Sequence, residues 1–303
     1  MAKRGVRMDA VLERDYMRYL QIEKGASPST ISQYQKDICA FFQNMDHTKP
    51  VEDVNHQDIR RYLALLQKDG YARRTVARKL ASLRSLWRFL EREGRIQLNP
   101  FLYVTTPKLD KKLPSFLYEN EMQAIFDAID TDSLLGARNL AIIELLYASG
   151  IRASECTGLK LKDIDLDLST LLVMGKGKKE RFLPVGSFAV EALSLYLDKR
   201  TAKFGPHAQS DPLFINYRGG ALTDRGLRKI LAKVIEDASL TSKLTPHVIR
   251  HTFATHMLNE GADLRTVQEL LGHTDLKATQ IYTHVTRDRL RDVYRHSHPR
   301  AKK

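Results

Sequence analysis

The sequence predicts a mainly α-helical protein with a small antiparallel β-sheet, organised in two domains. Three observations support this fold class. Apolar residues recur at helical spacing through most of the chain. A basic stretch bounded by prolines, Thr105 to Pro114, interrupts that pattern about a third of the way along. Short apolar runs separated by turn residues lie between residues 164 and 185, so the sheet belongs to the second domain.

The first domain is predicted to be a bundle of four helices. The first helix covers residues 9–23, and Ser27 to Thr30 form a turn and cap before the second. A third helix follows Asn55 and stops at Gly70, and a fourth runs from Arg74 to Arg95. Four helices of this length suit a compact DNA-binding bundle.

The fourth helix has two contrasting faces. On a helical wheel at about 100° per residue, its core side carries Val76, Leu80, Leu83, Leu86, Trp87 and Leu90. Between Arg60 and Arg95 there are eleven basic residues and three acidic ones. A solvated helix face usually carries both signs of charge. The side of this helix opposite its core side is mainly basic, so we interpret that side as facing DNA phosphates. The candidate DNA-binding residues are Arg74, Arg78, Arg84, Arg88 and Arg92.

Composition limits the class of protein. The 49 Lys and Arg residues exceed the 36 Asp and Glu residues and give a net charge of +13, which favours a polyanionic partner. The two cysteines, Cys39 and Cys156, fall in different domains, which is typical of a reduced cytosol. No apolar run approaches the roughly 20 residues that cross a bilayer, and the basic start lacks the apolar stretch of a signal peptide. We expect a cytoplasmic protein with no membrane partner.

The second domain is predicted to begin with helices at Glu119–Ile129 and Leu134–Ser149. Three short strands follow at Ile164–Leu166, Thr170–Met174 and Arg181–Val185. Helices then resume at Ser187–Phe204 and after the cap at Thr223, and continue through Arg295.

Chemistry concentrates between Thr245 and Tyr282. His247 and Arg250 lie three residues apart on a predicted helix and therefore share a face. Arg presents a planar fork that fits two phosphate oxygens, and His can pass a proton near neutral pH. His273 adds a second imidazole after a glycine turn, and Tyr282 adds a hydroxyl that can attack phosphorus. Because paired carboxylates are absent from this stretch, it indicates a tyrosine nucleophile acting on a phosphodiester rather than a two-metal nuclease.

This set of residues resembles the tyrosine recombinases of the phage integrase family. His-x-x-Arg, Leu-Gly-His and the tyrosine nine residues later all stand at the family's spacing. The family's upstream arginine matches Arg152 in Gly-Ile-Arg-Ala-Ser-Glu, and its lysine matches Lys176 in the turn Gly-Lys-Gly-Lys-Lys. The resemblance covers residues 8–298. It implies a helical, SAM-like core-binding domain at 8–98, a linker at 99–114 and a catalytic domain at 115–298.

The resemblance also implies the role of each residue. Arg152 and Arg250 bind the non-bridging phosphate oxygens, and Lys176 protonates the departing 5′ oxygen. His247 exchanges the tyrosine proton, His273 bonds the phosphate, and Tyr282 forms a 3′-phosphotyrosyl link. No metal, cofactor or ATP is expected, and no Walker-type phosphate loop occurs in the sequence.

Most of these residues also have an alternative interpretation. His247 and His273 would each be a satisfied core residue. Arg152 would form a surface salt bridge with Glu155, and Lys178 or Lys179 would replace Lys176 as the acid. His247, His251 and His256 would bind zinc, because the first two have the spacing of paired metal ligands. Tyr282 would be an ordinary helix aromatic.

The resemblance is greatest to the Xer branch of the family, which resolves chromosome dimers at cell division. It implies double-stranded DNA with a recombination site as the substrate and a homo- or hetero-tetramer on two duplexes. A sister recombinase and a DNA translocase are the further partners that it suggests. The alternatives are a phage or transposon integrase, a type IB-like topoisomerase with the same chemistry, or an inactive architectural DNA-binding protein.

Overall fold

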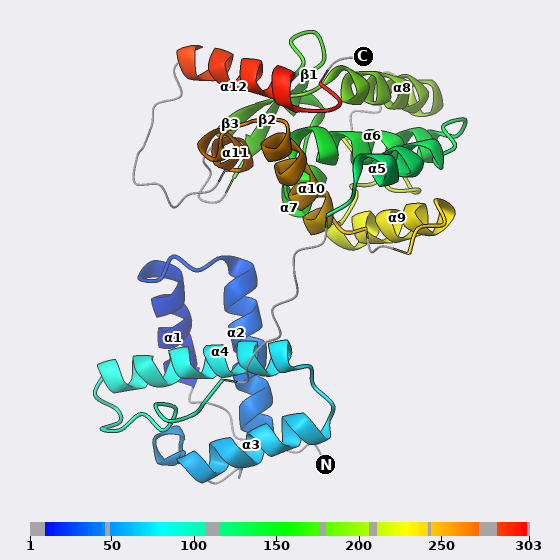
Figure 1. The fold of residues 1–303 in the computed structure, drawn as a ribbon. Coiled ribbons are helices and arrows are strands. Elements are labelled where there is room, and N and C mark those ends of the chain that lie inside the picture. Colours follow the sequence, from blue (N-terminus) through cyan, green and yellow to red (C-terminus); the bar gives the residue numbers. More distant parts are fainter. Residues whose placement is uncertain are drawn as a thin grey trace. The chain divides into compact units, whose positions relative to one another are not determined.

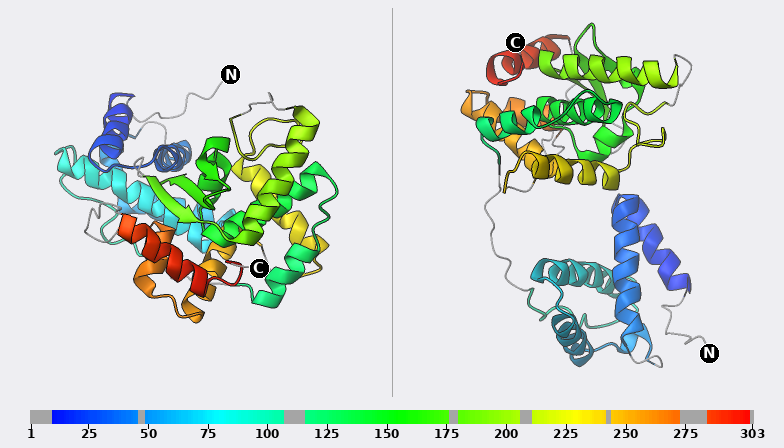
Figure 2. Two further views of the ribbon diagram at one scale, coloured as in Figure 1. Left: turned by 90° about the horizontal axis from the view of Figure 1, so that it is seen from above. Right: turned by 90° about the vertical axis from the view of Figure 1, so that its right-hand side faces the viewer.

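The computed structural model describes residues 10–45, 49–106, 116–175, 180–205, 211–241, 244–272 and 284–301. For residues 284–288 it describes the backbone alone. The chain divides into two compact units, Met1–Lys112 and Leu113–Lys303, drawn in Figures 1 and 2. The finer domain limits of 8–98, 99–114 and 115–298 stay predictions.

The first unit is built from helices. Its elements are α1 (Ala10–Ile22), α2 (Pro28–Gln43), the 3₁₀ turn η1 (Val51–Asp53), α3 (His56–Lys68) and α4 (Arg73–Arg92). The Ser27 hydroxyl accepts a hydrogen bond from the Thr30 amide and thereby caps α2. Asn55 and Asp58 form a capping box that starts α3. Helix α2 packs against both α1 and α4 (Figure 1).

Aromatic side chains fill the core of the first unit. Trp87 of α4 is fully buried and lies against Phe41, Phe42 and Phe101, with ring centroids 4.9–6.2 Å apart. Every residue predicted for the core side of α4 is buried. The predicted amphipathic helix is therefore confirmed.

The second unit is larger and contains the sheet. Its helices are α5 (Glu119–Asp127), α6 (Leu134–Ser149), α7 (Ala153–Gly158), α8 (Ser187–Phe204), α9 (Asp224–Asp237), α10 (Pro246–Asn259), α11 (Leu264–Leu271) and α12 (His284–Ser297). The 3₁₀ turn η2 (Leu161–Asp163) leads into β1 (Ile164–Asp165), β2 (Thr170–Met174) and β3 (Glu180–Pro184). These strands form one antiparallel sheet in the order β1-β2-β3, with Leu171 opposite Leu183.

Helix α6 lies at the centre of this unit. It packs against α8 and α10, and all residues from Ala141 to Ser149 are buried. A helix that is apolar on all sides belongs inside a domain. Helix α12 covers β3 and α10 and brings the C-terminus back onto the unit (Figure 1).

The C-terminal residues are anchored by one buried ion pair. The Arg300 guanidinium lies 4.1 Å from the Phe126 ring centre and 3.8 Å from that of Phe188. It donates hydrogen bonds to both carboxylate oxygens of Glu144, which is 2% exposed. The buried negative charge of Glu144 is thus compensated by Arg300.

The predicted fold class is confirmed, with local differences. Helix α7 was missed, because six residues are too few for a periodic signal. The last helical stretch is broken at Glu260–Asp263, where Gly261 adopts φ +88° and Asp263 caps α11. Within the described residues, no helix is both long enough and apolar enough to cross a membrane.

Candidate active site

Arg152 lies on the turn between α6 and α7. Gly150 ends α6 in the left-handed conformation, with φ +60°, and Arg152 is the N-cap residue of α7. The Glu155 carboxylate accepts hydrogen bonds from the Arg152 amide at 2.8 Å and from its guanidinium at 2.9 Å. The Arg152 side chain remains 43% exposed, so its charge is anchored on one side and open to solvent on the other.

Glu155 has a second arginine partner. Arg181 of β3 donates two hydrogen bonds of 3.0 Å, one to each carboxylate oxygen. Both side chains are buried, with 5% and 6% of their surfaces exposed. Burial raises the pKa of Glu155, but the bonds from Arg181 and from the Arg152 amide outweigh it and hold that pKa below its usual value. The carboxylate is therefore ionised and shared between two guanidinium groups.

Arg250 lies on α10, which begins after the Thr245 cap with Pro246 in its first turn. Its guanidinium donates hydrogen bonds to the carbonyl oxygens of Gly150 at 2.6 Å and Leu271 at 2.7 Å. Burial, followed by the nearby positive charge of Arg152, lowers the pKa of Arg250 to about 10. Arg250 therefore keeps its charge at neutral pH, and it holds the turn that carries Arg152.

Of the four remaining predicted residues, the structure describes only His247. His247 is exposed in the first turn of α10, one turn before Arg250. Lys176, His273 and Tyr282 lie outside the described residues. The chain is described up to Gly272, directly before His273, and again from the start of α12, two residues after Tyr282. The roles of all six residues stay predictions.

Arg181 was missed from the sequence as a residue of this site. Arg181 is the first residue of a predicted strand and follows a turn with three lysines, so it looks like an exposed strand end. The signal that would have found it is the strand period, because Arg181 and Leu183 share the buried face of β3. A buried guanidinium needs acceptors for its N–H groups, and here the Glu155 carboxylate accepts two of them.

The three histidines of the zinc alternative do not converge on one point. The Nδ1 atom of His256 lies 2.7 Å from the Tyr147 hydroxyl in the core, whereas His247 is exposed. Among the described residues, no three His, Cys, Asp or Glu side chains are grouped so that they could hold a metal ion.

The five DNA-binding candidates on α4 differ in their contacts. Arg78 pairs with Asp37, which is 1% exposed and also lies 3.5 Å from Lys79. Arg84 bonds the carbonyl oxygen of Val104 and the hydroxyl of Thr106. In the described part of the chain, the exposed residues Arg74 and Arg88 have no ion pair.

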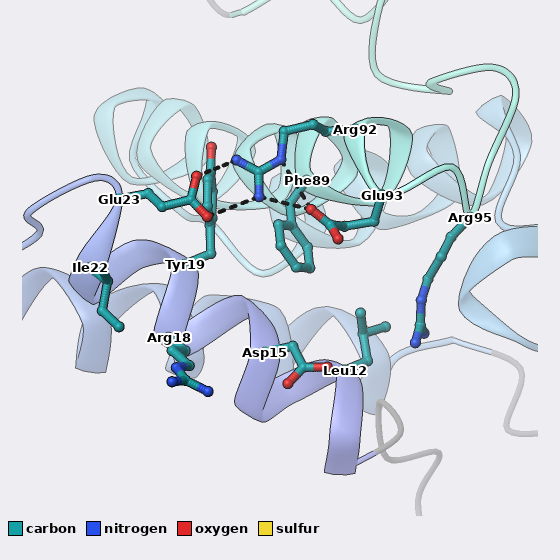
Figure 3. A pocket seen from close by; sticks show the side chains of 10 residues that line it. All are labelled: Leu12, Asp15, Arg18, Tyr19, Ile22, Glu23, Phe89, Arg92, Glu93 and Arg95. Carbon is teal, nitrogen blue, oxygen red and sulfur yellow. Dashed lines mark hydrogen bonds and ion pairs between the residues drawn. The ribbon is translucent and has the colours of Figure 1, made fainter.

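Arg92 lines a pocket of about 340 Å³ between α1 and α4 (Figure 3). It donates to both oxygens of Glu23 and to Glu93, and its guanidinium lies 4.3 Å from the Tyr19 ring centre. Two carboxylates therefore already compensate its charge. The interpretation of α4 as a DNA-facing helix stays a prediction.

Comparison with known proteins identifies the family. The phage integrase family matches residues 115–289, and the N-terminal SAM-like domain of phage integrases matches residues 14–94. The chain belongs to the phage integrase family. The tyrosine recombinase XerC of Halalkalibacterium halodurans is 51% identical over 292 residues, which are 94% of this chain and 96% of that protein. XerC of Bacillus subtilis (strain 168) is 46% identical over 290 residues, 94% and 95% of the two chains. The chain is a XerC-like tyrosine recombinase.

Solved structures agree with this assignment. The XerH site-specific recombinase bound to its difH substrate in a pre-cleavage complex has a TM-score of 0.65 and 26% identity, covering 92% of this chain and 83% of that one. The Tn1549 transposon integrase, in complex with a circular intermediate DNA, has a TM-score of 0.70 and 18% identity, covering 87% and 92%. At that identity the second likeness concerns the fold alone.

Proposed function

We propose that this protein cuts and rejoins double-stranded DNA at a specific site, with Tyr282 as the nucleophile. The phenolic oxygen of Tyr282 attacks the scissile phosphorus, the bond to the 5′ oxygen breaks, and a 3′-phosphotyrosyl link forms. The departing 5′ oxygen takes a proton, which we assign to Lys176. Attack by the 5′ hydroxyl of another strand then reverses these steps and releases Tyr282.

The observation that carries this proposal is the meeting of Arg152 and Arg250. They come from helices almost a hundred residues apart in sequence, and Arg250 bonds the carbonyl oxygen of Gly150 at the base of the Arg152 turn. A phosphodiester is already anionic and gains charge on its oxygens during attack. Two fixed guanidinium groups stabilise that charge without any rearrangement. His247, on the same face of α10 as Arg250, is proposed to exchange the tyrosine proton, and His273 to bond the phosphate.

The test is covalent trapping on a nicked duplex that carries a chromosomal resolution-type site. Wild type is expected to form a denaturant-resistant protein–DNA adduct, and Tyr282→Phe is expected to bind the same DNA without forming it. Tyr217→Phe is the matched control, since Tyr217 is an exposed tyrosine of the same unit, and it should form the adduct. An adduct that persists in Tyr282→Phe would remove Tyr282 as the nucleophile.

We propose chromosome dimer resolution in the cytoplasm as the cellular role. The similarity to XerC proteins over nearly the full length of both chains supports it, as does the likeness to a XerH recombinase solved on difH DNA. A tetramer on two duplexes, a sister recombinase and an activating DNA translocase form part of the same proposal. Adduct formation that needs an added sister recombinase would support a hetero-tetramer, and equal formation without one would support a protein that acts alone.

A further inference from the structure

Arg181 joins two elements that carry the candidate active site. From β3 it donates both terminal N–H groups to Glu155 of α7, and its Nε lies 3.3 Å from the carbonyl oxygen of Leu270 in α11. Only 6% of its side chain is exposed. Buried on all sides, this guanidinium cannot itself reach DNA.

The end of α11 is held by two arginines side by side. Arg181 bonds the carbonyl of Leu270, and Arg250 bonds that of Leu271. Gly272 follows in the left-handed conformation, with φ +65°, and a Cβ placed there would come within 3.1 Å of the Arg181 guanidinium. The flat face of that guanidinium therefore lies against the backbone of Gly272.

One carboxylate serves two arginines of opposite exposure. Glu155 bonds the half-exposed Arg152 and the buried Arg181 through the same pair of oxygens. Arg181 balances the negative charge of Glu155, so the positive charge of Arg152 is left uncompensated on its open side. Without Arg181, Glu155 would neutralise Arg152 instead, and its negative charge would weaken the attraction between Arg152 and a phosphate.

We propose that Arg181 is a positioning residue for DNA cleavage: it neutralises Glu155 and thereby keeps the charge of Arg152 available to the scissile phosphate. This inference rests on the proposed function, because it assigns Arg152 to the phosphate. A competing explanation is that the Arg181–Glu155 pair serves stability alone, as buried ion pairs do in many proteins.

The two explanations differ for a double variant. Arg181→Met is expected to slow adduct formation about 10- to 100-fold, the range typical of a residue that supports a reacting group. Arg181→Met combined with Glu155→Gln removes the unbalanced charge, and we expect it to regain about tenfold of that loss, because about 1.4 kcal/mol of repulsion would be relieved. A purely structural pair predicts that the double variant is as slow as the single one or slower.

A modified substrate gives a second readout. When a methyl group replaces one non-bridging oxygen of the scissile phosphate, less negative charge has to be stabilised. The loss of cleavage rate caused by Arg181→Met should then shrink to less than about a third of its value on the ordinary duplex. The reason is that the modified phosphate carries less negative charge for Arg152 to stabilise. An equal loss on both duplexes would overturn the proposal.

Arg300→Met is the matched control, because it breaks another buried arginine–carboxylate pair of the same unit, with Glu144. It should lower thermal stability without the substrate-dependent loss, and an identical kinetic profile would count against a specific role for Arg181. The Arg152 side-chain Nε–H signal, measured by NMR on the free protein, needs no cleavage. This signal should shift in Arg181→Met and not in Arg300→Met, even if wild type forms no adduct. The absence of an adduct would contradict the proposed function alone.

Discussion

Arg250 donates a 2.6 Å hydrogen bond to the carbonyl oxygen of Gly150, the residue that ends α6 two positions before Arg152. The distance between the two candidate phosphate-binding arginines is thus set by backbone geometry at a single glycine. Gly150 has φ +60°, which L-residues with a side chain rarely adopt. A Cβ at this position would come within 2.5 Å of the Phe253 ring and 2.9 Å of Leu271.

Gly150→Ala is therefore expected to disturb both stability and cleavage. The left-handed conformation costs an alanine about 1–2 kcal/mol, and the contact with Phe253 adds to this cost. We expect adduct formation to fall at least about tenfold, because the carbonyl that holds Arg250 must move. Gly158→Ala is the control, since a Cβ there meets nothing within 4 Å. Urea unfolding and single-turnover trapping measure the two effects, and equal behaviour of the two variants would contradict this explanation.

Periodicity was sufficient for most of the fold and insufficient for the contacts within the site. The helical wheel of α4 placed Leu80, Trp87 and Leu90 in the core because each lies on one stripe of a long helix. It could not show that Arg78 turns toward Asp37, because that carboxylate lies 41 residues away in the sequence. Likewise, the motif around Arg152 was visible, but the sharing of Glu155 with Arg181 depends on the pairing of distant elements.

Asp37→Ala is predicted to destabilise the first unit strongly. Asp37 accepts hydrogen bonds from Arg78, Ser82 and Gln33 and lies 3.5 Å from the buried amine of Lys79. Removing it leaves Lys79 without its compensating charge, a change that costs about 3–5 kcal/mol in buried pairs.

Trp87 fluorescence reports on the unfolding of the first unit, because Trp87 is the chain's single tryptophan and lies fully buried in that unit. Urea unfolding followed by its fluorescence should show the loss. Glu23→Ala is the control: its pair with Arg92 is exposed to solvent, so the change should cost far less stability than Asp37→Ala. A similar midpoint for both variants would show that Asp37 is not a centre of stability.

His298 should make the second unit less stable as the pH falls. Its Nδ1 accepts from the Arg300 amide at 3.1 Å, and its Nε2 lies 3.1 Å from the carbonyl oxygen of Tyr147, so the neutral ring satisfies both neighbours. Burial lowers the pKa of His298 to about 3, from an ordinary 6.5. Between these values the unfolded chain binds one more proton than the folded chain. Stability is therefore full above about pH 6.5 and falls by about 1.4 kcal/mol per pH unit below it.

The measurement is urea unfolding between pH 7.5 and 5, followed by circular dichroism. His298→Gln should be less stable at pH 7.5 and should show a shallower decline on acidification. Some decline should remain, because burial also lowers the pKa of His256. His296→Gln, at an exposed position of α12, should keep the wild-type slope. If the slope survives in His298→Gln, its source lies elsewhere.

The arginines of α4 should separate into two groups when DNA binding is measured against salt. The slope of log K against log[salt] counts phosphate contacts, at about 0.9 for each. Arg74 and Arg88 are exposed on α4, so each change to Ala should reduce the magnitude of this negative slope by about this amount. Arg92 is already engaged by Glu23 and Glu93, and Arg92→Ala should leave the slope nearly unchanged. A decrease in magnitude for Arg92→Ala but not for Arg88→Ala would mean that DNA breaks the Arg92–Glu23 pair. The phosphates would then meet the side of α4 that lines the pocket between α1 and α4.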